Sequence, residues 1–208
     1  MNARFGRRFA SYIIDILIIS LLLNLVGMII PENKTVTKLN EELLEINAEY
    51  LESENTSEED MTAYMEKTAP LTYQIDKANF IYSIIGIVVY LLYYVVFQYK
   101  NKGQTLGKKL MGIKVVKDEG ELTINDFIFR SFIINSVLFN IIILILLFTT
   151  KDITYVYGVS ILSVIQSIVM IVTVFMLLIR KDKKALQDVV TKTKVIEVAE
   201  WENLLNKN

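Results

Sequence analysis

Four long apolar stretches dominate this chain of 208 residues and limit what it can fold into. They run from Phe9 to Ile30, Ala78 to Phe97, Phe127 to Phe148 and Tyr155 to Ile179. Each is long enough to cross the roughly 30 Å hydrocarbon core of a bilayer as a helix. Hydrophobic residues make up 53% of the chain, and its mean hydropathy of +0.41 is too high for an ordinary soluble domain. The sequence therefore predicts an all-α membrane protein, a four-transmembrane-helix bundle.

Basic residues between the spans predict how the chain is oriented. Three Lys or Arg residues precede the first span, six lie between the second and third spans, and seven follow the fourth, against five in the other two connections. Positive charge collects on the cytoplasmic side of membrane proteins, so both termini are expected to be inside (N-in/C-in). The first span is long and contains Asp15, which favours a retained span over a cleaved signal peptide.

The spans divide the chain into eight segments. In order, they are a basic N-terminus with the first span (1–30), an extracytoplasmic acidic helical loop (31–77), the second span (78–97), a basic cytoplasmic loop (98–126), the third span (127–148), a short outer turn (149–154), the fourth span (155–179) and a cytoplasmic tail (180–208).

The outer segment and the central loop each have local signals. Residues 31–77 hold twelve acids and four lysines, and Ser57 with Asp60 has the spacing of a helix N-cap, so two short acidic helices are expected. They form either a cation-attracting or partner-binding cap or a solvated connection, the latter being favoured. In the central loop we expect a small interfacial helix with Lys102, Lys108 and Lys109 turned toward anionic lipid headgroups, and then a strand. We also expect a cap of the third span at Thr123 and Asp126.

Asp15 is the one acid inside a predicted span, and it is the strongest functional signal in the sequence. On a helical wheel it shares a face with Arg8 and Ser11, and Arg130 enters the third span at the same membrane level. We expect Asp15 to pair with Arg8 or Arg130 rather than to face lipid. Ionisable residues in spans are often functional, and a purely structural ion pair that fixes helix register is the alternative.

Uncharged polar residues also mark helix faces in the third and fourth spans. Such residues hold helices together more often than they line a transport pathway, and both interpretations stay open. The candidates, with Ser11 of the first span, are Asn135, Asn140, Ser160, Ser163, Gln166, Ser167 and Thr173.

The sequence offers little support for an enzyme. It has no Cys and no His, and no nucleophile–base pair, metal-ligand cluster or cofactor-binding loop is recognisable, so we expect no catalytic residue, metal or cofactor. The stretch "GQTLGKK" is one residue too short for a phosphate-binding P-loop, and Lys109 stands where Ser or Thr is needed. Nothing indicates nucleic-acid binding.

Three stretches together resemble the RDD family of bacterial membrane proteins. They are "RRFASYIID" in the first span, "GQTLGKKLMGIKVV" after the second and "ALQDVVTKTKVI" after the fourth. The resemblance identifies Arg8, Asp15 and Asp188 as the arginine and two aspartates of the family name. The family-motif loop is Gly103, Gln104, Thr105, Gly107 and Lys108. This chain departs from the pattern at Gln187, where the family often has His, so a proton-handling role of that His is not carried over.

The resemblance implies a multi-pass protein of the bacterial cytoplasmic membrane and transport of small solutes or cations. Arg8, Asp15, Arg130 and Asp188 would then form one charge cluster at the inner mouth of the bundle, where a carboxylate could exchange monovalent cations for protons. The alternative is a non-transporting adaptor, chaperone or regulatory subunit that engages another protein. Because four helices make a thin transporter, a homo-oligomer or a partner membrane protein is also considered.

Overall fold

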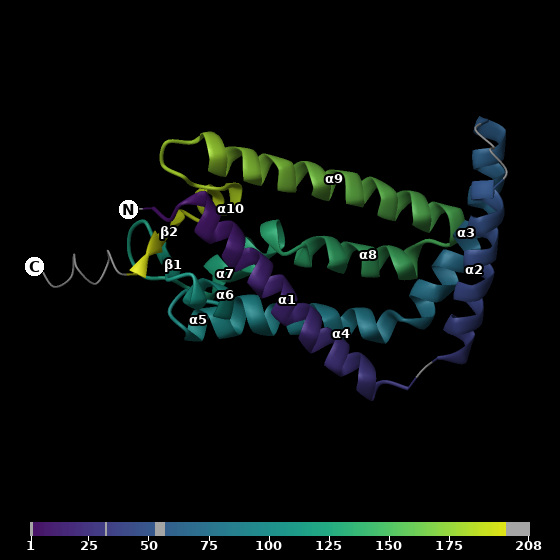
Figure 1. The fold of residues 1–208 in the computed structure, drawn as a ribbon, viewed down its shortest axis with the longest axis horizontal. Coiled ribbons are helices and arrows are strands. Elements are labelled where there is room, and N and C mark those ends of the chain that lie inside the picture. The colour runs from purple at the N-terminus through teal and green to yellow at the C-terminus, as the bar shows by residue number, and fades with distance from the viewer. Residues whose placement is uncertain (1, 32, 53–56, 199–208) are drawn as a thin grey trace, which may run out of the picture.

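In the computed structural model, described over residues 2–31, 33–52 and 57–198, helices lie side by side as an elongated bundle (Figure 1). The two ends of the bundle differ in structure, and we call them the hairpin end and the terminal end. The hairpin end carries α2 (Lys34–Glu52) and α3 (Glu58–Ala78). The terminal end carries Asn2, β1 (Ile113–Lys117), β2 (Thr193–Glu197) and the short helices of the central loop and tail.

Among the described residues, three helices are long and apolar enough to cross a membrane. They are α1 (Phe5–Ile29), the continuous helical run of Phe80–Lys100, and α9 (Asp152–Ile179). Two shorter helices, α7 (Ile124–Ile134) and α8 (Val137–Thr149), pass the same test together. Over the described residues the predicted four spans therefore correspond to three long apolar helices and one bent pair that could form a fourth span, on a mostly helical chain. In Figure 1, α1 crosses the bundle diagonally over α4.

The third span is not the continuous helix that the sequence predicted. Its halves are bent by 68° at Ser136, whose φ of 58° lies in the left-handed region. Neither Pro nor Gly marks this break, so periodicity alone gave no warning of it. Asn135 at the end of α7 and Ser136 supply polar side chains where the backbone ladder is interrupted, which makes the break a polar point inside an apolar span.

The second span is also irregular. It consists of α4 (Phe80–Leu91), a π-helical segment η1 (Leu92–Phe97) and a last turn, α5 (Gln98–Lys100). The wider π turn brings two successive tyrosines, Tyr93 and Tyr94, into the interior, where their rings meet edge to face at 5.0 Å. Single π turns inside α-helices are frequent at functional sites.

The hairpin end differs in size from the predicted pair of short acidic helices. α2 and α3 are 19 and 21 residues long, and Figure 1 shows them standing across the end of the bundle. The predicted cap at Ser57 is present, since its hydroxyl accepts the Asp60 N–H at 3.1 Å. α3 packs against α9 and continues almost directly into α4, so the hairpin is part of the folded body rather than a free connection.

At the terminal end, the central loop pairs with the tail. α6 (Leu106–Leu110) is followed by β1, which runs antiparallel to β2. β2 follows α10 (Leu186–Val190) and was not predicted. Buried Ile113 and Val115 of β1 pack with Val195 of β2 beneath this small sheet. The predicted capping box of the third span is present, with the Asp126 carboxylate accepting the Thr123 N–H at 2.8 Å.

Candidate functional site

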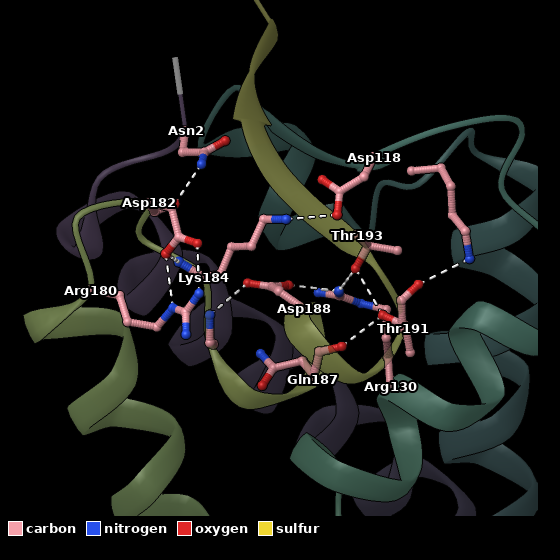
Figure 2. Close-up of polar contacts among 12 residues, drawn as sticks. Asn2, Asp118, Arg130, Arg180, Asp182, Lys184, Gln187, Asp188, Thr191 and Thr193 are labelled. Carbon is pink, nitrogen blue, oxygen red and sulfur yellow. Dashed lines mark hydrogen bonds and ion pairs between the residues drawn. The ribbon is translucent and has the colours of Figure 1, made fainter.

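Asp188 stands at the centre of a buried ion triad at the terminal end. Its carboxylate accepts hydrogen bonds from Arg8 Nη2 at 2.5 Å and from Arg130 Nη1 at 2.6 Å, and its exposed fraction is 0%. The residues come from α1, α7 and α10, so the triad ties the two ends of the chain to the third span. Figure 2 shows Asp188 and Arg130 facing each other beneath β2.

The surroundings of Asp188 favour its charged form. Burial alone would raise the pKa of this carboxyl, but the charges of Arg130 and Arg8 outweigh burial and hold the pKa below its usual value. The same carboxylate caps α10 by accepting the Ala185 N–H at 2.9 Å. Arg130 also donates to the hydroxyl of Thr193 on β2, and Arg8 donates to the Lys183 carbonyl at 2.8 Å.

Asp15 lies in a second, different set of contacts. One carboxylate oxygen accepts the Tyr93 hydroxyl at 2.6 Å and the Gly107 N–H at 2.8 Å. The other accepts the Thr105 hydroxyl at 2.6 Å and lies 3.8 Å from Lys108 Nζ. Asp15 is buried, with 1% of its surface exposed. Its hydrogen bonds to Thr105 and Gly107 and its ion pair with Lys108 hold the family-motif loop against α1.

The prediction that Asp15 pairs with an arginine is wrong. Both candidate arginines are bonded to Asp188, and the ion-pair partner of Asp15 is Lys108. The single predicted charge cluster is therefore two adjoining groups. The prediction that Lys108 turns to lipid headgroups outside the bundle is also wrong, because its side chain is only 16% exposed and points inward. Burial lowers the pKa of Lys108 to about 8, although the nearby Asp15 carboxylate opposes the shift.

The contacts of the motif loop, residues 103–108, account for the residue types found there. Gly103 has a φ of 90°, and a Cβ there would lie 2.3 Å from the Val115 carbonyl oxygen. Gln104 Nε2 donates to the Ile113 carbonyl at 2.9 Å, which ties the loop to β1. Thr105 caps α6 by accepting the Lys108 N–H, and Gly107 allows α6 to lie directly against α1. Gly103 and Gln104 thus fit the loop against β1, and Thr105, Gly107 and Lys108 hold it at Asp15.

A cavity of about 200 Å³ joins the two charged groups. We call it the charged cavity, because Arg8, Asp15, Lys108 and Arg130 all line it. With Asp188, which bonds both arginines, the site holds three basic groups and two carboxylates. Further polar side chains complete its wall: Ser11, Gln98, Ser131, Asn135, Thr173 and Gln187. Two atoms there, Thr173 Oγ1 and Gln187 Oε1, are buried without a hydrogen-bond partner.

The polar residues predicted on the fourth span have different surroundings. The hydroxyls of Ser160, Ser163 and Ser167 bond to carbonyls of their own helix, and all three residues are exposed in the bundle. Gln166 instead donates to the Ser136 hydroxyl at the break between α7 and α8. Of the predicted set on α9, Gln166 and Thr173 therefore face other helices.

A second cavity, which the sequence did not indicate, lies toward the hairpin end. We call it the Asp76 cavity; it has a volume of about 270 Å³ and is lined by Asp76, Ser83, Tyr90, Asn140 and Tyr155, among others. Tyr155 donates to the Asp76 carboxylate at 2.7 Å. Burial raises the pKa of Asp76, against the effect of this hydrogen bond. The predicted Asn140 thus belongs to this cavity, whereas Asn135, bonded to Ser131 at 3.4 Å, lines the charged cavity.

Two neighbouring tyrosines contribute to the linings of the two cavities, one to each. Tyr90 lines the Asp76 cavity and Tyr94 lines the charged cavity, and their ring centroids are 5.8 Å apart. In the part of the chain that the structure describes, no group of three or more Asp or Glu residues is placed to hold a metal ion. What the site offers is buried charge and hydrogen bonding inside a membrane-spanning bundle.

Comparison with known proteins places this arrangement in a family. No curated protein and no solved structure matches the chain. The model of the RDD family matches residues 2–192, which include Arg8, Asp15, the motif loop and Asp188. The ion triad and the Asp15 contacts are thus built from residues within the matched region. The chain, a multi-helix membrane protein, belongs to the RDD family.

Proposed function

We propose that the protein is a small transporter whose solute site is the charged cavity. The observation that carries this proposal is that the bundle holds two cavities with buried polar groups, and that the neighbouring rings of Tyr94 and Tyr90 line one cavity each. In this proposal Tyr90 and Tyr94 form the partition between the two cavities, and its movement would give access from alternate sides. The partition lies where helix irregularity is concentrated, since Tyr94 belongs to the π segment η1.

The broken span supports the same proposal. Discontinuous helices in transporters place backbone and polar groups at the solute site, where an unbroken helix would satisfy them internally. Here the break at Ser136 lies between Asn135 of the charged cavity and Asn140 of the Asp76 cavity. Gln166 donates to Ser136 at this point, so the break is held by a contact that can be exchanged. A change in the 68° bend would alter both cavities together.

Cation/proton exchange through Asp15 is the most specific form of this proposal. Asp15 is occupied by Tyr93, Thr105, Gly107 and Lys108, so a cation or a proton would have to displace at least one of these donors. Protonation of Asp15 would weaken its attraction to Lys108 and so loosen α6 from α1. In this mechanism the motif loop would couple the charge of Asp15 to opening of the cavity.

The Asp15→Asn variant tests this mechanism. The amide oxygen can still accept from Tyr93 and Gly107, so we expect a folded protein that cannot ionise at this position. Proton-coupled flux, measured in proteoliposomes over a panel of cations and small anions, should fall to background. The matched control is Asp182→Asn, an exposed aspartate paired with Arg180, which should keep wild-type flux.

Two other outcomes of this experiment decide between roles of Asp15. Wild-type flux in purified Asp15→Asn would exclude the coupling role. Flux that falls only in proportion to the folded fraction would assign Asp15 to structure alone.

The adaptor hypothesis has one observation in its favour. No residue of α2 is buried, and Leu44 and Leu51 are 66% and 80% exposed on this acidic helix. A partner protein could cover them. A folded wild-type protein that moves none of the tested solutes would favour this alternative over transport.

The proposed orientation places the terminal end in the cytoplasm. Positive charge on the segments at this end supports it. Because the chain has no cysteine, Glu59→Cys and Lys181→Cys provide single exposed labels at the two ends. In intact cells a membrane-impermeant thiol reagent should label Glu59→Cys but not Lys181→Cys. Lys181→Cys should be labelled only after the membrane is permeabilised. Labelling of Lys181→Cys in intact cells would reverse the orientation.

A further inference from the structure

The charged cavity has an excess of positive charge. Arg8, Lys108 and Arg130 outnumber the two carboxylates by one, and each carboxylate is already covered by donors. Asp188 accepts from two arginines, and Asp15 accepts on both of its oxygens. A cation entering the cavity would therefore find both acids occupied. An anion would find unused donors, because Arg130 makes both of its hydrogen bonds through Nη1.

Two buried polar atoms in the same wall have no hydrogen-bond partner, and they indicate that the ligand carries polar groups in addition to an anion. Thr173 and Gln187 are 4% and 2% exposed, yet Thr173 Oγ1 and Gln187 Oε1 have no hydrogen-bond partner. A buried polar atom without a partner is costly, so each indicates a ligand group or water that completes it. The Gln187 carbonyl oxygen needs a donor. A ligand that combines an anionic oxygen with a hydroxyl or N–H group would satisfy the basic residues and these two atoms together.

Apolar side chains of α1 and α9 line another part of the cavity. Phe5 and Phe9 line it from α1, and Met170, Val174 and Leu177 line it from α9. Phe9 and Val174 are 53% and 41% exposed on the outside of the bundle, where acyl chains would lie. α1 packs chiefly on α4 and α6, whereas α9 packs chiefly on α3 and α8, so the cavity is bounded by two helices with different neighbours.

We infer that the charged cavity binds the headgroup of an anionic phospholipid from the cytoplasmic leaflet, with the acyl chains leaving between α1 and α9. The phosphate would lie against Lys108 and Arg130, and a headgroup hydroxyl would meet Gln187 and Thr173. Basic pockets between membrane helices on the cytoplasmic side suit such headgroups. The inference does not depend on the proposed function, because it assigns to the charged cavity a lipid ligand that is distinct from the solute a transporter would carry.

Binding to the purified full-length protein in neutral detergent tests the inference without any flux. Phosphatidylglycerol should form a one-to-one adduct in native mass spectrometry and raise the unfolding temperature, whereas phosphatidylcholine with the same acyl chains should do neither. sn-Glycerol 3-phosphate has the same phosphate chemistry without the chains, and we expect it to bind much more weakly. Phosphatidylcholine binding as well as phosphatidylglycerol, or the soluble phosphate binding as tightly as the lipid, would overturn the lipid assignment.

Neighbouring lysines provide a matched pair of variants. Lys108→Gln should weaken phosphatidylglycerol binding by about tenfold, the effect of one charge-assisted hydrogen bond. Lys109→Gln removes the same charge from an exposed position on α6 and should have a clearly smaller effect. Equal losses in the two variants would mean general surface attraction and would contradict a site in the cavity.

A second variant removes the unpartnered hydroxyl while keeping all charges. Thr173→Val has nearly the same shape, and we expect it to fold and to bind phosphatidylglycerol about fivefold more weakly, the effect of one neutral hydrogen bond. Unchanged affinity in both Thr173→Val and Lys108→Gln would refute the site. A protein that binds the lipid in this way but transports nothing would leave the inference standing and remove the proposed function.

Discussion

Asp188→Asn is expected to destabilise the protein by about 3–5 kcal/mol, since it leaves two buried arginines without their common counter-charge. The asparagine oxygen can replace one carboxylate oxygen, but its amide group would then face a guanidinium, donor against donor. The substitution also weakens the hydrogen bond from the Ala185 N–H to the Asp188 carboxylate, which is 2.9 Å long and caps the start of α10. The free energy of unfolding of purified wild type and variant in detergent, measured by chemical denaturation, checks this expectation.

The control for this prediction is Asp182→Asn. Its side chain is 42% exposed and pairs with Arg180 at 2.7 Å, and surface pairs of this kind contribute about 0–1 kcal/mol. An Asp188→Asn protein as stable as Asp182→Asn would show that the triad does not stabilise the fold.

The effect of Asp188 should also depend on pH. Its pKa is lower in the folded protein than its usual value of 3.8, so its stabilising contribution is complete above that value. As the pH falls through the folded-state pKa, protonation removes the contribution. The stability difference between wild type and Asp188→Asn should therefore be constant near neutral pH and shrink only below pH 3.8.

Local signals in the sequence predicted local structure well. The caps at Ser57 and Thr123 are present because each needs only a hydroxyl and an acid three residues later. The three long apolar helices follow from runs of apolar residues whose length matches a bilayer. The arginines and Asp188 do come together at one end, as the resemblance and the membrane level of Arg130 suggested.

The partners of Asp15 could not be predicted in this way. Tyr93 and Thr105 lie 78 and 90 residues after Asp15 in the sequence. Whether an arginine pairs with Asp15 or with Asp188 depends on how the C-terminal tail folds back onto the bundle. The pairing of β1 with β2 decides this, because Thr193 of β2 and Asp188 just before it converge on Arg130. Opposite charge suggested arginine for Asp15, but hydroxyl and backbone donors satisfy a buried carboxylate equally well.

The break in the third span was missed for another reason. Ser136 has a left-handed backbone conformation that few non-glycine residues adopt, and the apolar run on either side continues as if the helix were intact. A signal did exist, since Ser131, Asn135, Ser136 and Asn140 place four polar side chains around one point of a span. Packing them between helices was one interpretation, and the structure shows that they also flank the bend.

Gly107→Ala is expected to separate α6 from α1. A Cβ at this position would lie 2.3 Å from the Ser11 carbonyl oxygen and 2.7 Å from Asp15 Oδ1, and neither atom can move away without displacing α1 or its buried carboxylate. Relief of the clash requires α6 to move outward, which would stretch the Gly107 N–H contact with Asp15 and the Thr105 hydroxyl contact beside it. Overpacking costs about 1–3 kcal/mol, and loss of hydrogen bonds to a buried charge adds to it.

The prediction is a loss of about 3 kcal/mol in the free energy of unfolding, measured as for Asp188→Asn. Gly6→Ala is the matched control, because a Cβ there meets nothing within 4 Å and alanine favours the helix. Asp15→Ala removes one of the two atoms that Gly107→Ala would strike, so the double variant should lose less than the sum of the single losses. Strict additivity, or a Gly107→Ala protein as stable as Gly6→Ala, would show that the motif loop is not held against α1 at Asp15.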